Sequence, residues 1–246
     1  MDEPGETSAA PATGDPATGD PATGDPATGD PATGDPATGD PAWLASRPVL
    51  IFDLGGVVLD WNPRYLFAQL IPDEATREWF LTEVCSPSWN LQMDAGKPSA
   101  EAVAELSACY PGQAGLISAY WERWIEMLGG PIPGTGELVA ELAGSGRELY
   151  AISNFCGEVW PATMAAFPVL HCFKDIVISS FVGVCKPDPR IFALALRRFG
   201  VTAEDCLFID DAAANVEGAK AAGIAAVQFT SAAALRRLLA AGEPAS

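Results

Sequence analysis

The chain has 246 residues, and its 32 acidic side chains outnumber its 14 basic ones, so the formal net charge is -18. This acidic balance argues against a nucleic-acid surface, although a small phosphate ligand needs only a local positive charge. No apolar run approaches the about 20 residues of a membrane helix, and the N-terminus lacks the basic and apolar regions of a signal peptide, so we expect a cytoplasmic protein with no membrane partner.

The N-terminal segment differs in composition from everything after it. Residues 11–40 are six copies of Pro-Ala-Thr-Gly-Asp, and the first 42 residues carry nine acidic side chains and no basic one. Proline at every fifth position and the lack of large apolar side chains exclude both a helix and a core. We therefore predict a disordered tail over residues 1–42, whose role as a spacer or as a repeat without function stays open.

The first predicted strand runs from residue 49 to residue 52 and ends at Asp53. Its four apolar residues are typical of a strand that is buried on both faces, as in a parallel sheet. A carboxylate after such a strand lies where open α/β sheets bind their ligands, and the glycines that follow let the backbone approach what Asp53 binds. The alternative is that Asp53 only caps a turn.

Residues 63–130 show helical spacing of apolar residues and little strand-like alternation, so we predict a helical cap inserted after the first strand. Pro98 and Ser99 start one of its helices, with Ser99 as the expected N-cap. A later helix carries an apolar stripe, which we interpret as core rather than as a wall of a ligand site: Tyr120, Trp121, Trp124, Ile125 and Leu128.

Beyond residue 130 the pattern alternates between strands and helices. Strands are expected at residues 148–152, 175–178, 206–209 and 224–229, with helices at 136–144, 189–199, 212–222 and 231–241. Alternation of this kind produces right-handed βαβ units. The predicted fold class is therefore α/β, a Rossmann-like doubly wound parallel sheet built from residues 43–62 and 131–246, with the helical cap inserted between them.

Polar residues follow several of these strands: Asp53, Ser153 and Asn154, Lys186, Asp210 and Asp211. If the sheet is parallel, all of them open on one edge. Carboxylates gathered there repel one another unless a cation lies among them, and a set of oxygen ligands favours Mg²⁺. A hydroxyl, backbone N–H groups and one ammonium group can bind a phosphate. The combination suits phosphoryl transfer through an acyl-phosphate.

Four segments in a fixed order carry a resemblance to a known family: Asp53-Leu54-Gly55-Gly56-Val57, Ile152-Ser153-Asn154, Lys186-Pro187-Asp188-Pro189, and residues 208–219. Over residues 48–230 the chain resembles the haloacid dehalogenase (HAD) superfamily of hydrolases, some of which carry a helical cap after the first motif. The form of the first motif, together with residues 93–99, looks most similar to a branch of sugar-phosphate phosphatases that includes an α-glucose-1-phosphatase.

The resemblance implies a role for each matching residue. Asp53 would be the nucleophile that attacks phosphorus. Mg²⁺ would be bound by Asp53, by the backbone carbonyl of Gly55 and by Asp211, with Asp210 behind them or bound through water. Substrate phosphate oxygens would be held by three further residues, of which the last also neutralises charge: Ser153, the backbone of Asn154, and Lys186.

One position departs from the family pattern. Phosphatases of this superfamily usually carry a second aspartate two residues after the nucleophile, where it protonates the leaving oxygen, and here that position is Gly55. General acid–base help is worth about 10²–10⁴-fold in rate. The substrate could have a better leaving group, another residue such as Asp60 or Asp94 could supply the proton, or the reaction could differ.

The function implied is Mg²⁺-dependent hydrolysis of a small phosphorylated metabolite, with sugar phosphates as one substrate class. A 2-haloacid dehalogenase is the first alternative, because those relatives also lack the second aspartate, although the acidic pair Asp210-Asp211 opposes it. A non-catalytic binding or scaffold domain is the second alternative, motivated by Gly55 and the acidic tail. The oligomeric state stays open.

Overall fold

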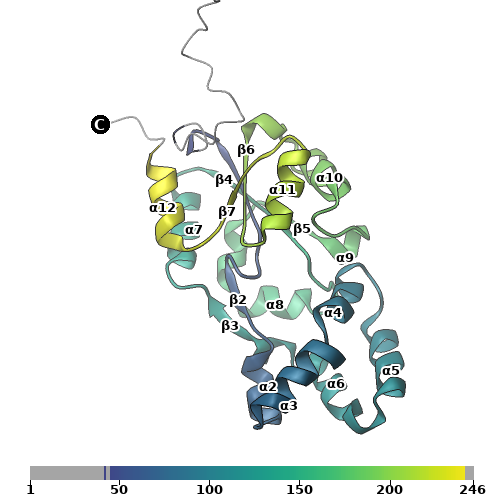
Figure 1. Cartoon of the computed structure of the whole chain (residues 1–246). Helices are drawn as coiled ribbons and strands as arrows, with labels where there is room; N and C mark the ends of the chain where they lie inside the picture. Colours follow the sequence, from purple (N-terminus) through teal and green to yellow (C-terminus); the bar gives the residue numbers. More distant parts are fainter. Residues whose placement is uncertain (1–41, 43–44, 242–246) are drawn as a thin grey trace, which may run out of the picture. The chain divides into compact units, whose positions relative to one another are not determined.

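The computed structural model describes residue 42 and residues 45–241, which belong to one compact unit of the chain (Figure 1). Apart from residue 42, the tail predicted over residues 1–42 therefore lies outside the described residues. Within the described part of the chain, no helix combines the length and the apolar character that crossing a membrane would require.

The central sheet has five parallel strands in the order β5-β4-β1-β6-β7. The strands are β1 (Val49–Phe52), β4 (Glu148–Ser153), β5 (Asp175–Ile178), β6 (Cys206–Asp210) and β7 (Ala225–Gln228). This order confirms the predicted doubly wound sheet, because the chain builds outward from β1 first in one direction and then in the other. The order reverses between β1 and β6, and α/β sheets bind ligands at such a switch point.

Helices cover both faces of the sheet. One face packs against α7 (Thr135–Gly144), α8 (Trp160–Ala166) and α12 (Ala232–Ala240), and the other against α10 (Pro189–Phe199) and α11 (Ala213–Ala221). Strand β1 shows why its sequence is continuously apolar. Leu50 and Phe52 pack into the first layer, whereas Val49 and Ile51 pack into the second.

The helix termini follow local sequence signals. Asp188 is the N-cap of α10, as predicted, because its carboxylate accepts a hydrogen bond from the backbone N–H of Arg190, and Gly200 ends the helix in the left-handed conformation. The remaining connections include four short helical segments: α9 (Ser179–Val182), η4 (Pro168–Cys172), η5 (Ala203–Asp205) and η2 (Pro111–Gln113).

The inserted segment folds into cap helices, and their hydrophobic cluster also includes Phe155, Cys156 and Ile178 from the α/β part of the chain. The cap helices are α2 (Arg64–Leu70), α3 (Glu74–Trp79), the π-helical η1 (Phe80–Val84), α4 (Pro87–Asp94), α5 (Ser99–Cys109), α6 (Ala114–Glu122) and η3 (Trp124–Met127). Figure 1 shows α2 to α6 gathered beyond one end of the parallel strands. Phe67, Phe80 and Tyr120 are fully or almost fully buried among them. Of the predicted apolar stripe, Tyr120 is thus core, whereas the prediction is wrong for Ile125, which is 36% exposed.

Two features differ from the sequence expectations. A short antiparallel pair, β2 (Leu59–Trp61) and β3 (Leu128–Pro131), connects the sheet to the cap helices, and its two strands lie far apart in sequence. Ser99 is the first residue of α5 rather than its N-cap, which is Pro98. The Ser99 hydroxyl instead donates a 2.5 Å hydrogen bond to Glu158, so a contact with the core takes the place of the local cap.

Candidate active site

The sequence-predicted polar residues come together at the C-terminal edge of the sheet. Because β1, β4 and β6 are parallel neighbours, the residues that follow them open on the same side. A pocket of about 240 Å³ lies there. Its lining includes five of the seven predicted site residues and a second group from the cap side: Asp53, Gly55, Ser153, Asn154 and Asp211, with Trp61, Asn90, Asp94, Trp124 and Phe155.

Lys186 connects two of the predicted carboxylates. Its Nζ lies 2.8 Å from Asp53 Oδ1 and 2.7 Å from Asp210 Oδ2, and the side chains of Lys186 and Asp210 are almost completely buried. The ammonium group also lies 5.4 Å from the centre of the Phe208 ring. A lysine that bridges two carboxylates in this way is held in one position, and its charge is directed at the nucleophile predicted from the sequence.

The side chain of Asn154 holds the backbone of Lys186 in place. Its Oδ1 accepts a 2.7 Å hydrogen bond from the Lys186 N–H, and its Nδ2 donates a 3.0 Å bond to the Lys186 carbonyl. The sequence predicted that the Asn154 backbone holds phosphate. The structure adds that both polar atoms of the Asn154 side-chain amide form hydrogen bonds with the loop that carries Lys186.

Three carboxylates gather around the end of β1. Ligand atoms of Asp53, Asp210 and Asp211 all lie within 4.8 Å of one another. Burial raises the pKa of Asp53 to about 7, with the Asp210 charge raising it further and Lys186 opposing both. Burial likewise raises the pKa of Asp211, with Asp210 contributing next. Three carboxylates balanced by one ammonium group leave an excess of negative charge, so this donor set fits a hard divalent cation such as Mg²⁺.

The two fourth-motif aspartates are used differently. Both Asp210 oxygens are already engaged, accepting hydrogen bonds from the Ala212 N–H, the Asn215 amide and Lys186 Nζ. Asp211 is exposed and lines the pocket. This arrangement favours Asp211 as the direct cation ligand and Asp210 as the residue that orients Lys186 and Asn215.

Gly56 explains why the first motif carries a second glycine. The residue has a positive φ of 76°, a conformation that side-chain-bearing residues rarely adopt. A Cβ built there would come within 2.7 Å of Asp211 Cγ. The glycine therefore lets the Asp211 carboxylate approach the β1 loop closely enough to share one ligand with Asp53.

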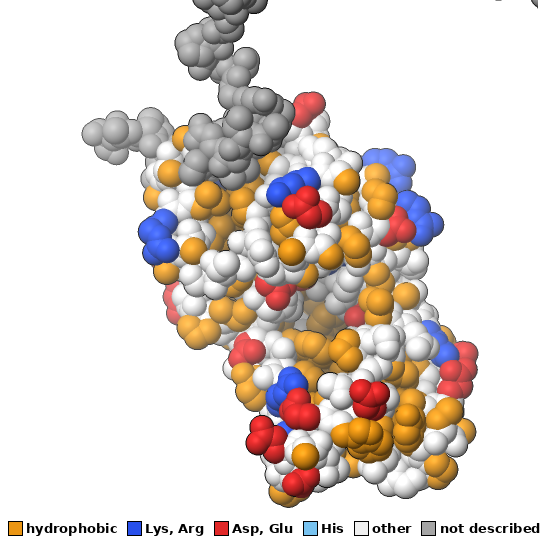
Figure 2. Space-filling model, in the orientation of Figure 1, with side chains coloured by type: hydrophobic (Ala, Val, Ile, Leu, Met, Phe, Trp, Pro, Cys, Tyr) orange, Lys and Arg blue, Asp and Glu red, His pale blue; other side chains and the backbone are white. Residues whose placement is uncertain are grey.

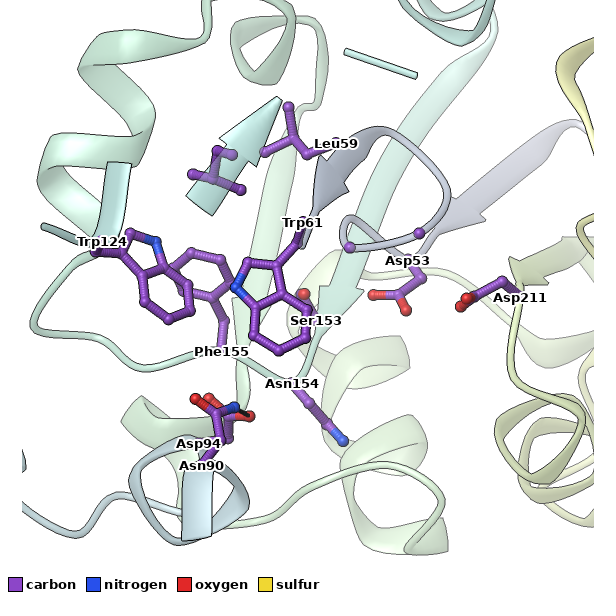
Figure 3. Close-up of a pocket in the computed structure, with 13 residues that line it drawn as sticks. Asp53, Leu59, Trp61, Asn90, Asp94, Trp124, Ser153, Asn154, Phe155 and Asp211 are labelled. Carbon is purple, nitrogen blue, oxygen red and sulfur yellow. Dashed lines mark hydrogen bonds between the residues drawn. The ribbon is translucent and has the colours of Figure 1, made fainter. Parts of the chain in front are cut away.

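A further carboxylate reaches the pocket from the cap. Asp94, at the end of α4, is 6% exposed, and Figure 3 shows it with Asn90 on the cap side of the pocket, away from Asp53 and Asp211. Burial raises the pKa of Asp94 to about 7, with the charge of Asp53 contributing next. Asp60, the other residue that the sequence offered as a proton donor, is not among the described residues that line this pocket; its carboxylate accepts a hydrogen bond from Tyr65.

Aromatic side chains form the apolar part of the pocket. Trp61 and Trp124 stack with ring centroids 6.1 Å apart, and Phe155 meets Trp124 edge to face at 5.4 Å. The interpretation of the Trp124 stripe as core is therefore incomplete, since Trp124 packs in the cap core and also lines the pocket. In Figure 2 the surface is hollowed between the regions of α11 and α4, and hydrophobic side chains border the hollow on the cap side.

Several pocket residues were not anticipated. Trp61, Asn90 and Phe155 carried no recognisable signal, because each lies in a segment whose local pattern indicates only a strand, a helix or a loop. The only sequence signal for Asp94 was its place in the cap segment that resembles one branch of the family.

Comparison with known proteins identifies the family. A family model described as haloacid dehalogenase-like hydrolase matches residues 48–223, so the chain belongs to this hydrolase family. The match spans the four strands β1, β4, β5 and β6, the cap helices and all four sequence motifs, as the resemblance predicted.

The individual relatives and solved structures resemble this chain at low sequence identity. The sesquiterpene phosphatase astK of Aspergillus oryzae is 27% identical over 187 residues, which cover 73% of this chain and 88% of that protein. A HAD family enzyme from Bacteroides thetaiotaomicron, solved with magnesium and inorganic phosphate, has a TM-score of 0.58 at 22% identity and covers 74% of this chain and 94% of its own. The L-2-haloacid dehalogenase of Xanthobacter autotrophicus has a TM-score of 0.57 at 20% identity, covering 81% and 84%.

Proposed function

We propose that this chain is a Mg²⁺-dependent phosphatase that hydrolyses a small phosphomonoester through an aspartyl-phosphate on Asp53. The observation that carries the proposal is the grouping of Asp53, Asp210 and Asp211 within 4.8 Å around the buried ammonium group of Lys186. A nucleophilic carboxylate, a cation site and a fixed positive charge at a sheet switch point are the elements that phosphoryl transfer requires.

The chain's own residues have separate roles in this proposal. Asp53 attacks phosphorus, and Lys186 neutralises charge on Asp53 and on the phosphoryl oxygens. The buried Ser153 hydroxyl and the backbone N–H groups near Asn154 bind phosphate oxygens at the end of β4. Fixed donors of this kind stabilise charge that develops in the transition state without reorganising when it forms.

Asp53, the Gly55 carbonyl and Asp211 would hold the Mg²⁺ ion, with Asp210 supporting them. When bound, the ion would polarise the phosphoryl oxygens and offset the repulsion between the carboxylates. The same offset favours ionised Asp53, whose pKa burial otherwise raises to about 7. A bound cation would thus help to keep the nucleophile deprotonated at neutral pH.

The residues on the cap side of the pocket are relevant to which substrate the pocket accepts. We propose that residues 63–130 act as the cap that selects the leaving group, because Asn90, Asp94 and Trp124 line the pocket from that side. A cavity of about 240 Å³ accommodates a small molecule. Aromatic rings accept either an apolar chain, which agrees with the sesquiterpene phosphatase relative, or the C–H face of a sugar, which agrees with the sugar-phosphatase resemblance.

A panel of phosphomonoesters assayed with Mg²⁺ and with EDTA tests the proposal, and the panel includes terpenyl, sugar and aryl phosphates. We expect Mg²⁺-dependent phosphate release that is lost in Asp53→Asn, a variant of nearly the same shape that cannot act as the nucleophile. Turnover that persists in EDTA, or the absence of turnover for every phosphomonoester, would contradict the proposal.

A C–halogen hydrolase is the second candidate, favoured by Gly55 and by the likeness in fold to a haloacid dehalogenase. The acidic cluster opposes it, since three carboxylates repel a haloacid's own carboxylate. Halide release from 2-haloacids, measured in the same panel, would reverse this ranking.

A further inference from the structure

The Asp94 side chain is a buried polar group that the proposed roles leave unexplained. Its Oδ2 accepts a 2.9 Å hydrogen bond from Asn90 Nδ2, but its buried Oδ1 has no hydrogen-bond partner among the described residues. An unsatisfied buried carboxylate oxygen costs free energy, and such groups in folded proteins call for an explanation. Because Asp94 lines the pocket that Asp53 also lines, a bound substrate is the missing partner that the geometry offers.

The position of Asp94 is tightly constrained. Tyr120 Oη donates a 3.3 Å hydrogen bond to Asn90 Oδ1, which directs the Asn90 amide N–H group at Asp94 Oδ2. The backbone carbonyl of Asp94 accepts a 2.6 Å bond from Ser179 Oγ, which belongs to the core and itself accepts a 2.9 Å bond from the Phe155 N–H. The cap therefore holds the Asp94 side chain in a fixed orientation at the pocket wall, with one carboxyl oxygen that accepts no hydrogen bond from the described residues.

Stereochemistry places the leaving group on the cap side of the pocket, where Asp94 also lies. In phosphoryl transfer the attacking and leaving oxygens lie roughly in line with phosphorus between them. Because Asp53 attacks from the sheet, the leaving oxygen points away from the sheet and toward the cap, where Figure 3 shows Asp94. Gly55, the family position for the proton donor, has no side chain, and a Cβ built there meets no described residue's atom within 4 Å.

We propose that Asp94, delivered by the cap helix α4, is the general acid–base residue of the reaction and replaces the carboxylate missing at Gly55. The inference rests on the proposed phosphatase function and adds to it a further catalytic residue. In the first step, Asp53 bonds to phosphorus as the ester P–O bond breaks, and the Asp94 carboxyl proton passes to the leaving oxygen, so a neutral alcohol departs.

The second step returns both groups to their starting states. The Asp94 carboxylate accepts a proton from water as the water oxygen bonds to phosphorus and the bond between phosphorus and Asp53 breaks. Inorganic phosphate leaves, Asp53 is again a carboxylate, and Asp94 again carries its proton. The pKa of Asp94, which burial raises to about 7, lets it hold and release a proton near neutral pH.

Leaving-group dependence tests this role with p-nitrophenyl phosphate and n-butyl phosphate as probes. Nitrophenolate departs without a proton, whereas butoxide needs one. In Asp94→Asn we expect kcat for butyl phosphate to fall about 10²–10⁴-fold. The first turnover of p-nitrophenyl phosphate should change less than about tenfold and appear as a burst of nitrophenolate, since the second step then lacks its base.

Two further variants complete the experiment. Asp60→Asn, which changes the other candidate carboxylate, should behave as wild type on both probes. Asp94→Ala should show the same split as Asp94→Asn, and its nitrophenolate burst also reports that the protein is folded.

Equal losses on the two probes, or undiminished butyl phosphate turnover in Asp94→Asn, would overturn the acid–base role. Equal losses would instead describe a residue that only positions substrate. A wild-type protein that hydrolyses neither probe nor any phosphomonoester of the panel would overturn the phosphatase function itself, and the inference with it.

Discussion

At the residue scale, the carboxylates of the pocket differ in what balances their charge. Asp53 and Asp210 contact Lys186, whereas Asp94 has only the neutral amide of Asn90. A buried carboxylate without a cation favours its protonated form, which is why the pKa of Asp94 is raised to about 7. The same environment that suits a proton donor therefore lowers the stability of the folded protein at neutral pH.

This cost predicts that Asp94→Asn stabilises the protein in a pH-dependent way. The pKa of Asp94 is raised from 3.8 to about 7 in the folded protein, so below pH 3.8 this residue does not lower the free energy of unfolding. The free energy of unfolding falls as pH rises between the two values, and the full loss is present above pH 7. We expect the variant to gain on the order of 2–4 kcal/mol over wild type at pH 8.

Urea unfolding of the two proteins in EDTA at pH 4.5 and pH 8 measures this difference. Because the two proteins share every other ionisable group, the change in their stability difference with pH reports on position 94. A difference of the same size at both pH values would contradict the buried-charge explanation.

At the element scale, the connection between the cap helix α4 and the core determines where Asp94 lies. Ser179, at the start of α9, is fully buried and joins the Asp94 carbonyl to the Phe155 N–H through its hydroxyl group. Each of these backbone groups would otherwise be buried without a partner. One hydroxyl thus links a cap helix, the loop after β4 and the segment after β5.

Ser179→Ala should therefore affect both stability and catalysis. Loss of the hydroxyl leaves a buried N–H and a buried carbonyl unpaired, at a cost of about 1–3 kcal/mol in unfolding free energy. It also loosens Asp94, so kcat for an alkyl phosphate should fall more than the first turnover of an aryl phosphate.

Ser180→Ala is the matched control for this prediction. Its hydroxyl accepts a 2.6 Å hydrogen bond from the Gly157 N–H, so the variant also unpairs one backbone group but leaves the Asp94 contact intact. Denaturant unfolding and steady-state kinetics compare the two. Equal effects on kcat in both variants would show that the Ser179 bond does not position Asp94.

At the scale of the whole molecule, the sheet order brings together residues that are far apart in sequence. Strand β1 lies between β4 and β6, so Asp53, Ser153 and Asp211 end on one edge although about 100 and 158 residues separate the last two from the first. The carboxylates of Asp53, Asp210 and Asp211, which this arrangement brings together, repel one another in the native state.

A cation that binds only the folded protein should relieve this repulsion. With Mg²⁺ at 100 times its dissociation constant, we expect a stabilisation of about 2.7 kcal/mol, which corresponds to a rise in Tm of roughly 5–10 °C for a protein of this size. The shift should be largely lost in Asp211→Asn and retained in Asp60→Asn. Thermal unfolding with Mg²⁺ or EDTA tests this independently of activity, and an equal shift in both variants would place the cation elsewhere.

Local sequence patterns were sufficient for the elements of the core. Strands such as β1 and β6 are continuous apolar runs because both of their faces are covered, and α10 is bounded by its own Asp188 cap and Gly200 stop. The predicted site residues followed from these strands, because parallel strands bring their ends to one edge. The roles of Asp53, Lys186 and Asp211 in catalysis and cation binding stay predictions until they are tested.

Tertiary structure alone decided the cap side of the site. The pairing of β2 with β3, the Ser99–Glu158 contact and the approach of Asn90 and Asp94 to the pocket all join segments that are distant in sequence. Helical spacing shows that a residue lies on the apolar face of a cap helix, but not whether that face meets another helix or the active site. The motifs and the alternation of strands and helices can thus be read from the local sequence of this protein, whereas its proposed proton donor depends on how the cap helix α4 packs against α9, a contact between distant segments that no local pattern records.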